Sequence, residues 1–209
     1  MTRGETRPRR LTPLYLAALL LCSSCADRPA SPPAREQALA AIATLGGTVE
    51  VDPKDPGKEV VAVDLNKSKV TDTDLAHVEG LNELRKLDLR LTGISDAGVA
   101  RLKSLTRLQT LNLFRTGLTD AGLEQLKGLA QLETLLLGGT KVTDAGLVHL
   151  KSFPELKKLS LFDTQVTDAG LEHLKGLTKL ETLLIGKSKV SEAGLKALQQ
   201  SVPKLRFEE

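Results

Sequence analysis

Three histidines are the residues whose type best suits acid–base or metal chemistry. His77, His149 and His173 occupy the same position of a pattern that recurs every 24 residues. Each stands between two apolar residues of a predicted short helix, so the imidazoles are expected to face solvent. A metal pair of His149 and His173 on adjacent helices is the alternative, although packed helices lie about 8–10 Å apart. Because no histidine is predicted to reach the strand side, the sequence offers no Ser–His or Cys–His nucleophile there.

A column of acidic residues, one in each copy of the pattern, could in principle bind calcium. Each acid directly follows a Thr or Ser at the start of the predicted helix, where a hydroxyl can cap the backbone N–H groups. An acid in the first turn is also favoured by the helix dipole. We therefore interpret the column as helix capping, with a calcium ladder as the alternative, and the Ala-Gly pairs that follow as packing glycines. The acids are Asp72, Asp96, Asp120, Asp144, Asp168 and Glu192, and the hydroxyls are Thr71, Ser95, Thr119, Thr143, Thr167 and Ser191.

Both cysteines lie near the N-terminus, and Cys22-x-x-Cys25 could form a redox or metal pair. The flanking sequence favours a targeting role instead. Residues 1–10 are rich in arginine, and residues 14–22 (LYLAALLLC) are an apolar run, shorter than the roughly 20 residues that cross a bilayer. This order is typical of a secretory signal peptide, which we predict over residues 1–24. Since no other cysteine exists, a disulfide framework is excluded.

The end of this leader, Leu21-Cys22-Ser23-Ser24-Cys25, resembles the box of bacterial lipoproteins. The resemblance implies that Cys25 is acylated and anchors the chain to a membrane of the cell envelope, on the periplasmic side or at the surface. Cys22 stands where that box usually has leucine. Cleavage at the small-x-small site Ser24-Cys25-Ala26, followed by free secretion, is the alternative. Residues 25–33 are predicted to be a short, stiff tether.

One repeated phrase dominates the remaining sequence. Each copy begins with LxxLxLxxT, whose alternation with period two predicts a short strand. The leucines that follow, such as Leu123, Leu126 and Leu129, are spaced by three and predict a short helix. Hydrophobic residues make up 41% of the chain but aromatic residues only 2%, which favours a regular core of leucine and valine. The copies begin at Val60, Leu84, Leu108, Leu132, Leu156 and Leu180.

This phrase resembles the leucine-rich repeat, in particular the ribonuclease-inhibitor and cysteine-containing subfamilies, whose helical half reads T-D-x-G-L. The resemblance implies a single α/β domain, a right-handed solenoid with a parallel concave sheet and short convex helices. The family's Asn or Cys after the strand is replaced here by a hydroxyl. We expect these buried hydroxyls to satisfy backbone groups of the adjacent turn as a threonine ladder. They are Ser68, Thr92, Thr116, Thr140, Thr164 and Ser188.

Further boundaries follow from composition. Residues 34–59 are predicted to be an N-terminal cap, with a helix that stops at Gly46-Gly47 and an extended lead-in. Residues 60–201 hold six repeats, and residues 202–209 form a closing strand whose polar end protects the sheet edge.

In the first 24 residues four arginines face one glutamate, which accounts for the formal charge of +3. The rest of the chain is balanced, so no nucleic-acid partner is predicted.

The third, fifth, seventh and eighth positions of LxxLxLxx are expected to face out of the concave sheet. Two phenylalanines then lie on the exposed face, about two strand spacings or 9–10 Å apart, with a glycine slot between them. Exposed apolar clusters with a polar rim are typical of binding sites, although a cap packed onto the rings is the alternative. The predicted partner-binding residues are Asp88, Arg90, Asn112, Phe114, Arg115, Leu136, Gly138, Phe162, Asp163 and Leu184.

These observations predict a non-catalytic protein-interaction module of the cell envelope, monomeric and without cofactor or metal. One alternative is a substrate-recognition protein similar to F-box leucine-rich-repeat proteins, whose repeats also carry T-D-x-G-L. Residues 26–59 contain nothing like an F-box, and a secretory leader disagrees with that role. An enzyme is the remaining alternative, for which the sequence nominates no residues.

Overall fold

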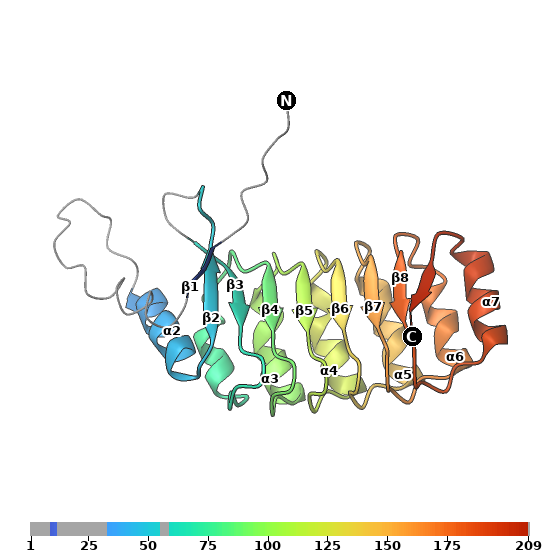
Figure 1. Ribbon diagram of the computed structural model, residues 1–209, viewed down its shortest axis with the longest axis horizontal. Helices are drawn as coiled ribbons and strands as arrows, with labels where there is room; N and C mark the ends of the chain where they lie inside the picture. The colour runs from blue at the N-terminus through green and yellow to red at the C-terminus, as the bar shows by residue number, and fades with distance from the viewer. Residues whose placement is uncertain (1–8, 12–32, 55–58, 209) are drawn as a thin grey trace.

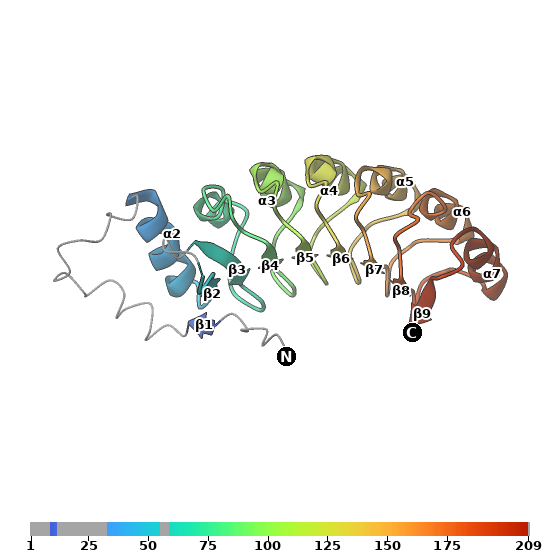
Figure 2. The ribbon, with the colours of Figure 1, turned by 90° about the horizontal axis from the view of Figure 1, so that it is seen from above.

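The computed structural model describes residues 9–11, 33–54 and 59–208, and it confirms the predicted leucine-rich-repeat solenoid (Figure 1). A single sheet contains nine strands in sequence order, from β1 to β9. Figure 2 shows the chain as an arc, with the strands on the inner side and the helices on the outer side. Among the described residues, no helix lies on the inner side of this sheet. The described helices therefore leave the inner side of the sheet uncovered.

The repeats place equivalent residues side by side because the parallel strands pair exactly one repeat apart. Leu87 is paired with Leu111, and Leu111 with Leu135. Only the first strands differ, since β2 is antiparallel to both of its neighbours, β1 and β3. The strands are β1 Arg9–Leu11, β2 Thr48–Val51, β3 Val60–Asp64, β4 Lys86–Asp88, β5 Thr110–Asn112, β6 Thr134–Leu136, β7 Lys158–Ser160, β8 Thr182–Leu184 and β9 Arg206–Glu208.

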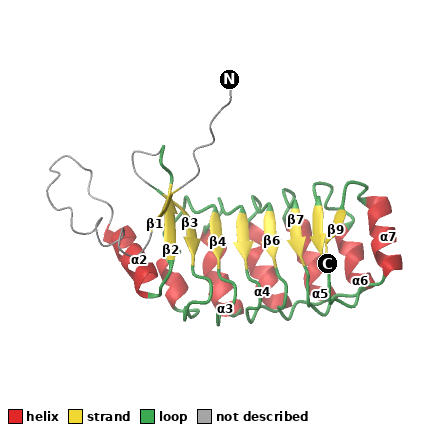
Figure 3. Cartoon of the chain, viewed as in Figure 1, coloured by secondary structure: helices red, strands yellow, loops and turns green. Residues whose placement is uncertain are grey.

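The convex side carries one short helix in each repeat (Figure 3). Most begin as one α-helical turn and continue as a 3₁₀ helix. The leucine spacing of three explains this change, because residues three apart eclipse each other in a 3₁₀ helix and so all face inward. The helices are α2 Pro33–Thr44, η1 Asp74–His77, α3 Asp96–Val99, η2 Ala100–Ser104, α4 Asp120–Gln125, η3 Leu126–Gly128, α5 Asp144–Leu147, η4 Val148–Ser152, α6 Asp168–Leu171, η5 Glu172–Leu174 and α7 Glu192–Ser201.

One continuous apolar core runs the length of the arc. Columns of leucine, such as Leu113 and Leu137, are 0% exposed. Phe153 is also fully buried and takes a position that is leucine in other repeats. The hydroxyl column lies above this core, and Thr116 donates to the carbonyl of Leu113 at 2.8 Å. The four threonines of the column are buried and satisfy backbone carbonyls as expected. Ser68 and Ser188 differ, because they are half-buried and accept from the N–H groups of Val70 and Val190. Each bond stays within its own repeat, so the column is not a ladder between repeats.

The N-terminal end differs from the repeats. Helix α2 covers the first residues of the core with Ala38 and Ile42, and Gly46 then turns the chain with a φ of +79°. The predicted signal peptide (apart from β1), the predicted lipidation site Cys25 and the predicted tether before Pro33 lie outside the described residues. Among the residues that the structure describes, no helix is long and apolar enough to cross a membrane.

Candidate partner-binding surface

The acidic column links each repeat to the next. Asp96 accepts from the backbone N–H of Thr119 at 2.8 Å and from its hydroxyl at 2.6 Å. The Thr119 hydroxyl in turn accepts from the N–H of Ala121, which confirms its predicted capping role. The sequence interpretation placed the acid only in the dipole of its own helix and missed this bond across repeats. The same pair of bonds joins Asp72 to Ser95, Asp120 to Thr143, Asp144 to Thr167 and Asp168 to Ser191.

The glycine of each Thr-Asp-Ala-Gly segment makes room for this carboxylate. A Cβ atom at Gly122 would collide with Asp96 Oδ1, and one at Gly146 would collide with Asp120 Oδ1. The glycine is therefore a packing residue, as predicted, and its reason is the close approach of the preceding repeat. We call the five aspartates from Asp72 to Asp168 the aspartate ladder; they are half-buried.

The first repeat has no preceding ladder aspartate, and Asp74 of the same repeat binds its threonine instead. Asp74 stands where later repeats have glycine, and it accepts from the N–H of Thr71 at 2.8 Å and from its hydroxyl at 2.6 Å. These hydrogen bonds hold the pKa of Asp74 below its ordinary value. The departure of this copy from Ala-Gly thus has a physical consequence, because Asp74 binds Thr71 in the way that the aspartate of the preceding repeat does in later copies.

The strand part of the concave face is more closed than predicted. Asn112 is 7% exposed, because its amide donates to Asp88 at 3.2 Å and its oxygen accepts from the N–H of Phe114 at 3.1 Å. Asp88 also forms an ion pair with Arg90 at 3.3 Å. Leu136 and Leu184 are half-buried on the same face. Asn112 is therefore a positioning residue with little surface left for a partner.

The seventh and eighth positions lie on the turn beyond each strand, at its carboxyl end. The eighth residue has a positive φ in every copy, for example 53° in Arg115 and 56° in Leu91. The positive φ was not predicted from the sequence. The one available signal was Gly139, a glycine at the same position, which has a φ of 69°. Leu91 was also missed; it is 38% exposed and is the exposed large apolar residue of the described chain.

The predicted slot between the two phenylalanines is filled. Gly138 is buried, and a Cβ atom there would stand 2.9 Å from the ring of Phe114. Phe114 therefore lies across Gly138 rather than beside an empty space, and this expectation was wrong. Both rings are half-buried and carry a cation, with Arg115 5.3 Å from the centre of Phe114 and Lys187 5.5 Å from that of Phe162.

The histidines lie in η1, η4 and η5, on the helical side of the arc. His77 and His173 are exposed and His149 is half-buried. Within the described ranges, no group of three or more His, Cys, Asp or Glu residues is arranged to hold a metal ion. The three histidines are thus distributed along the arc, one in each of three repeats, rather than gathered at one point.

Comparisons with known proteins agree with this fold. A leucine-rich-repeat family model matches residues 81–103, 104–127 and 155–175. An internalin C2 from Listeria monocytogenes is 23% identical, with 84% of this chain and 81% of that chain covered and a TM-score of 0.53. A second internalin from the same organism is 20% identical, with 70% and 52% covered and a TM-score of 0.43. No curated protein matches the chain.

Proposed function

We propose that this chain is a non-catalytic protein-binding module of the cell envelope, which contacts its partner with the concave side of the solenoid. The observation that carries the proposal is the open inner face of the sheet, which no helix of the described chain covers (Figure 2). Solenoids with this curvature provide extended concave surfaces for macromolecules. Half-buried Leu136 and Leu184 offer apolar area on this side, and half-buried Phe114 and Phe162 extend it onto the turns at the carboxyl edge.

The chemistry of the concave side supports binding rather than catalysis. Two of its carboxylates already have partners, since Asp88 is bound to Arg90 and Asn112, and Asp64 accepts from the amide of Asn66 at 2.7 Å. A catalytic centre needs a nucleophile, a base and a group that orients the base within mutual reach. The histidines, which are the best candidates for a base, lie on the opposite side of the arc.

A membrane anchor at Cys25 would place this surface in the envelope. We expect Cys25→Ala to release the full-length chain from membranes or to block its processing. Cys22→Ala is the matched control and should leave membrane association unchanged. Fractionation and N-terminal sequencing of the mature chain test both variants. A mature N-terminus beyond residue 25 contradicts acylation and supports free secretion instead.

The double variant Phe114→Ala, Phe162→Ala tests the binding surface. Covering the exposed parts of both rings contributes about 1–2 kcal/mol each, so loss of both should weaken binding at least about tenfold. Binding is measured by capture of the partner from envelope extract with the full-length chain, followed by titration. Lys127→Ala with Lys151→Ala, on the helical side, is the control and should bind normally.

The double variant must also be shown to remain folded. Because Phe114 packs on Gly138, the double variant should lose roughly 1–2 kcal/mol of stability yet remain folded on its intact leucine core, as circular dichroism can check. A folded double variant that binds as tightly as the parent would place the site elsewhere.

A further inference from the structure

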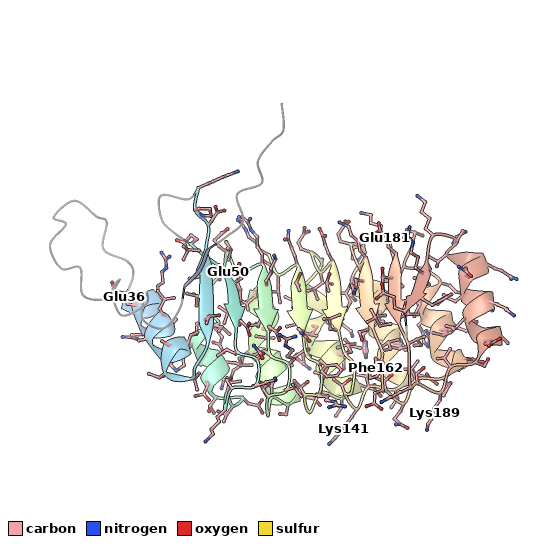
Figure 4. All side chains as sticks on the ribbon, viewed as in Figure 1. Glu36, Glu50, Lys141, Phe162, Glu181 and Lys189 are labelled. Atoms are coloured by element: carbon pink, nitrogen blue, oxygen red, sulfur yellow. The ribbon has the colours of Figure 1, made fainter. Side chains whose placement is uncertain are left out.

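The two edges of the sheet differ in charge. The six turns at the carboxyl edge, residues 66–69, 90–93, 114–117, 138–141, 162–165 and 186–189, contain seven basic residues and one acid, Asp163. All seven basic residues are exposed. Figure 4 shows Lys141, Phe162 and Lys189 along this edge and Glu181 at the opposite one. We call the seven the basic edge: Lys67, Lys69, Arg90, Arg115, Lys141, Lys187 and Lys189.

The opposite, amino edge uses its charges internally. Lys157 is bound to Glu133 at 2.8 Å and Lys179 to Glu155 at 2.6 Å, each across one repeat. Arg107 is bound to Glu83 in the same way. Among the ion pairs within 4 Å in the described part of the chain, the basic edge contributes only that of Arg90 with Asp88. Its other cations are thus available to an external carboxylate.

The aspartate ladder lies behind this edge and offsets part of its field. Its carboxylates are half-buried, and each has both oxygens hydrogen-bonded to the following repeat, as for Asp120 with Thr143. A partner at the edge therefore meets cations first. The attraction is short-ranged, because salt screens exposed charges over about 8–10 Å. This arrangement favours a ligand with separated carboxylates over a densely charged polyanion such as DNA, with one charge per roughly 1.7 Å.

Apolar groups alternate with these cations. Leu91 is exposed beside the half-buried Phe114, and the carbonyl of Phe114 accepts from the N–H of Leu91 at 2.8 Å. Arg115 and Lys187 lie against the faces of Phe114 and Phe162. A carboxylate that pairs with either cation thus has an aromatic ring beside it. The edge matches a ligand that combines acidic and apolar side chains.

From these observations we infer that the basic edge binds an extended, acidic segment of the partner protein that carries apolar residues. The inference rests on the proposed function and specifies its partner. Successive strands are about 4.8 Å apart, so the six turns span about 24 Å. An extended chain advances about 3.3 Å per residue, so about seven or eight residues cover this length. Acidic side chains would pair with Arg115 and Lys187, and an apolar side chain would cover Leu91.

A defined peptide tests the inference without the natural partner. The probe is a fluorescein-labelled peptide of about ten residues, built from glutamate and glycine with two leucines, and its matched control has lysine in place of glutamate. Fluorescence anisotropy with the full-length chain should show binding of the glutamate peptide and no binding of the lysine peptide. Raising the salt concentration from about 50 to about 300 mM should weaken the binding of the glutamate peptide.

Charge reversal then locates the site. Arg115→Glu with Lys187→Glu should weaken binding at least about tenfold. Lys103→Glu with Lys151→Glu, which makes the same change of charge on exposed residues of the helical side, should change it less than about twofold. Leu91→Asn keeps a residue that tolerates positive φ and should weaken binding without loss of thermal stability.

Several outcomes would overturn the inference. The parent chain could fail to bind the glutamate peptide, or it could bind the lysine peptide equally well. The two charge-reversal variants could lose the same amount of peptide affinity. The chain could also bind anionic lipid vesicles or a single-stranded oligonucleotide more tightly than the glutamate peptide. The proposed function fails separately. If a partner protein contacts the concave side while the peptide does not bind, only the identity of the bound segment is wrong.

Discussion

At the scale of single residues, the Thr-Asp-Ala-Gly segment acts between repeats. Asp120 bonds to Thr143, 23 positions away, and Gly146 leaves the space that this carboxylate occupies. The periodicity of the sequence shows that these residue types recur together. It could not show the bond, because positions 23 apart come into contact only when the repeats are stacked. The predicted cap was therefore correct but incomplete.

Gly146→Ala should destabilise the chain. The added methyl group would collide with Asp120 Oδ1 and force the ladder apart, with an expected cost of about 1–3 kcal/mol from overpacking. Gly176→Ala is the matched control, since a Cβ atom there meets nothing within 4 Å, and it should be neutral or stabilise by up to about 1 kcal/mol. Urea unfolding of both variants measures the difference; equal midpoints would mean that the glycines do not accommodate the ladder.

Low pH should weaken the interaction between Asp168 and Ser191, the last pair of the aspartate ladder. Hydrogen bonds from the hydroxyl and the N–H of Ser191 hold the pKa of Asp168 below its ordinary value of 3.8. A carboxyl whose pKa is lower in the folded chain contributes stability above its unfolded pKa, and this contribution is lost as the pH falls through the folded value. Asp168→Asn should thus be less stable than the parent at pH 7, and the two should converge below a pH of about 3.8.

Ser191→Ala provides a second measure of the same pair. It removes the hydroxyl donor but keeps the N–H donor, so thermal unfolding should show a smaller acid-dependent loss than in the parent. If the stability of both variants depended on pH as that of the parent does, the bond between Asp168 and Ser191 would not contribute to stability.

At the scale of elements, the sequence predicted most of the fold. The alternating leucines identified the strands, and the leucines three apart identified the convex helices. The pattern did not show where each strand ends. Alternation continues from Leu111 through Leu113, yet β5 stops at Asn112 and the chain turns through Arg115 with positive φ. Five of the six residues at this position are not glycine, so composition carried almost no signal, and Phe114 was placed on the strand face instead of the turn.

Leu137→Asp should be severely destabilising, because it puts an unpaired carboxylate into a side-chain position that is 0% exposed. The expected cost is several kcal/mol, on the order of 3–5. His149→Ala, on the outer helical side, should stay within about 0.5 kcal/mol. Denaturant unfolding compares them, and similar losses in both would mean that the inward and outward columns have been assigned incorrectly.

At the scale of the whole molecule, the arc separates stability from recognition. The leucine core and the aspartate ladder hold neighbouring repeats together, and the bonds of the ladder join adjacent repeats, as expected for a solenoid. The turns of the basic edge are also joined across repeats by backbone hydrogen bonds, such as that from the N–H of Leu91 to the carbonyl of Phe114, but their cationic side chains are exposed. The sequence indicated this division through two phenylalanines outside the leucine columns. It could not indicate that one ring covers Gly138 or that the cations collect at one edge, because both depend on the turn geometry.

Site-specific photo-crosslinking in the living cell can show which side of the solenoid contacts the partner protein. A photoreactive amino acid replaces Leu136 or Leu184 on the concave side, or Lys127 or Lys151 on the helical side, in the full-length chain. The account predicts that one partner protein is crosslinked from both concave positions and from neither helical position. Crosslinking of that protein from the helical positions alone, or of no protein from the concave positions, would contradict it.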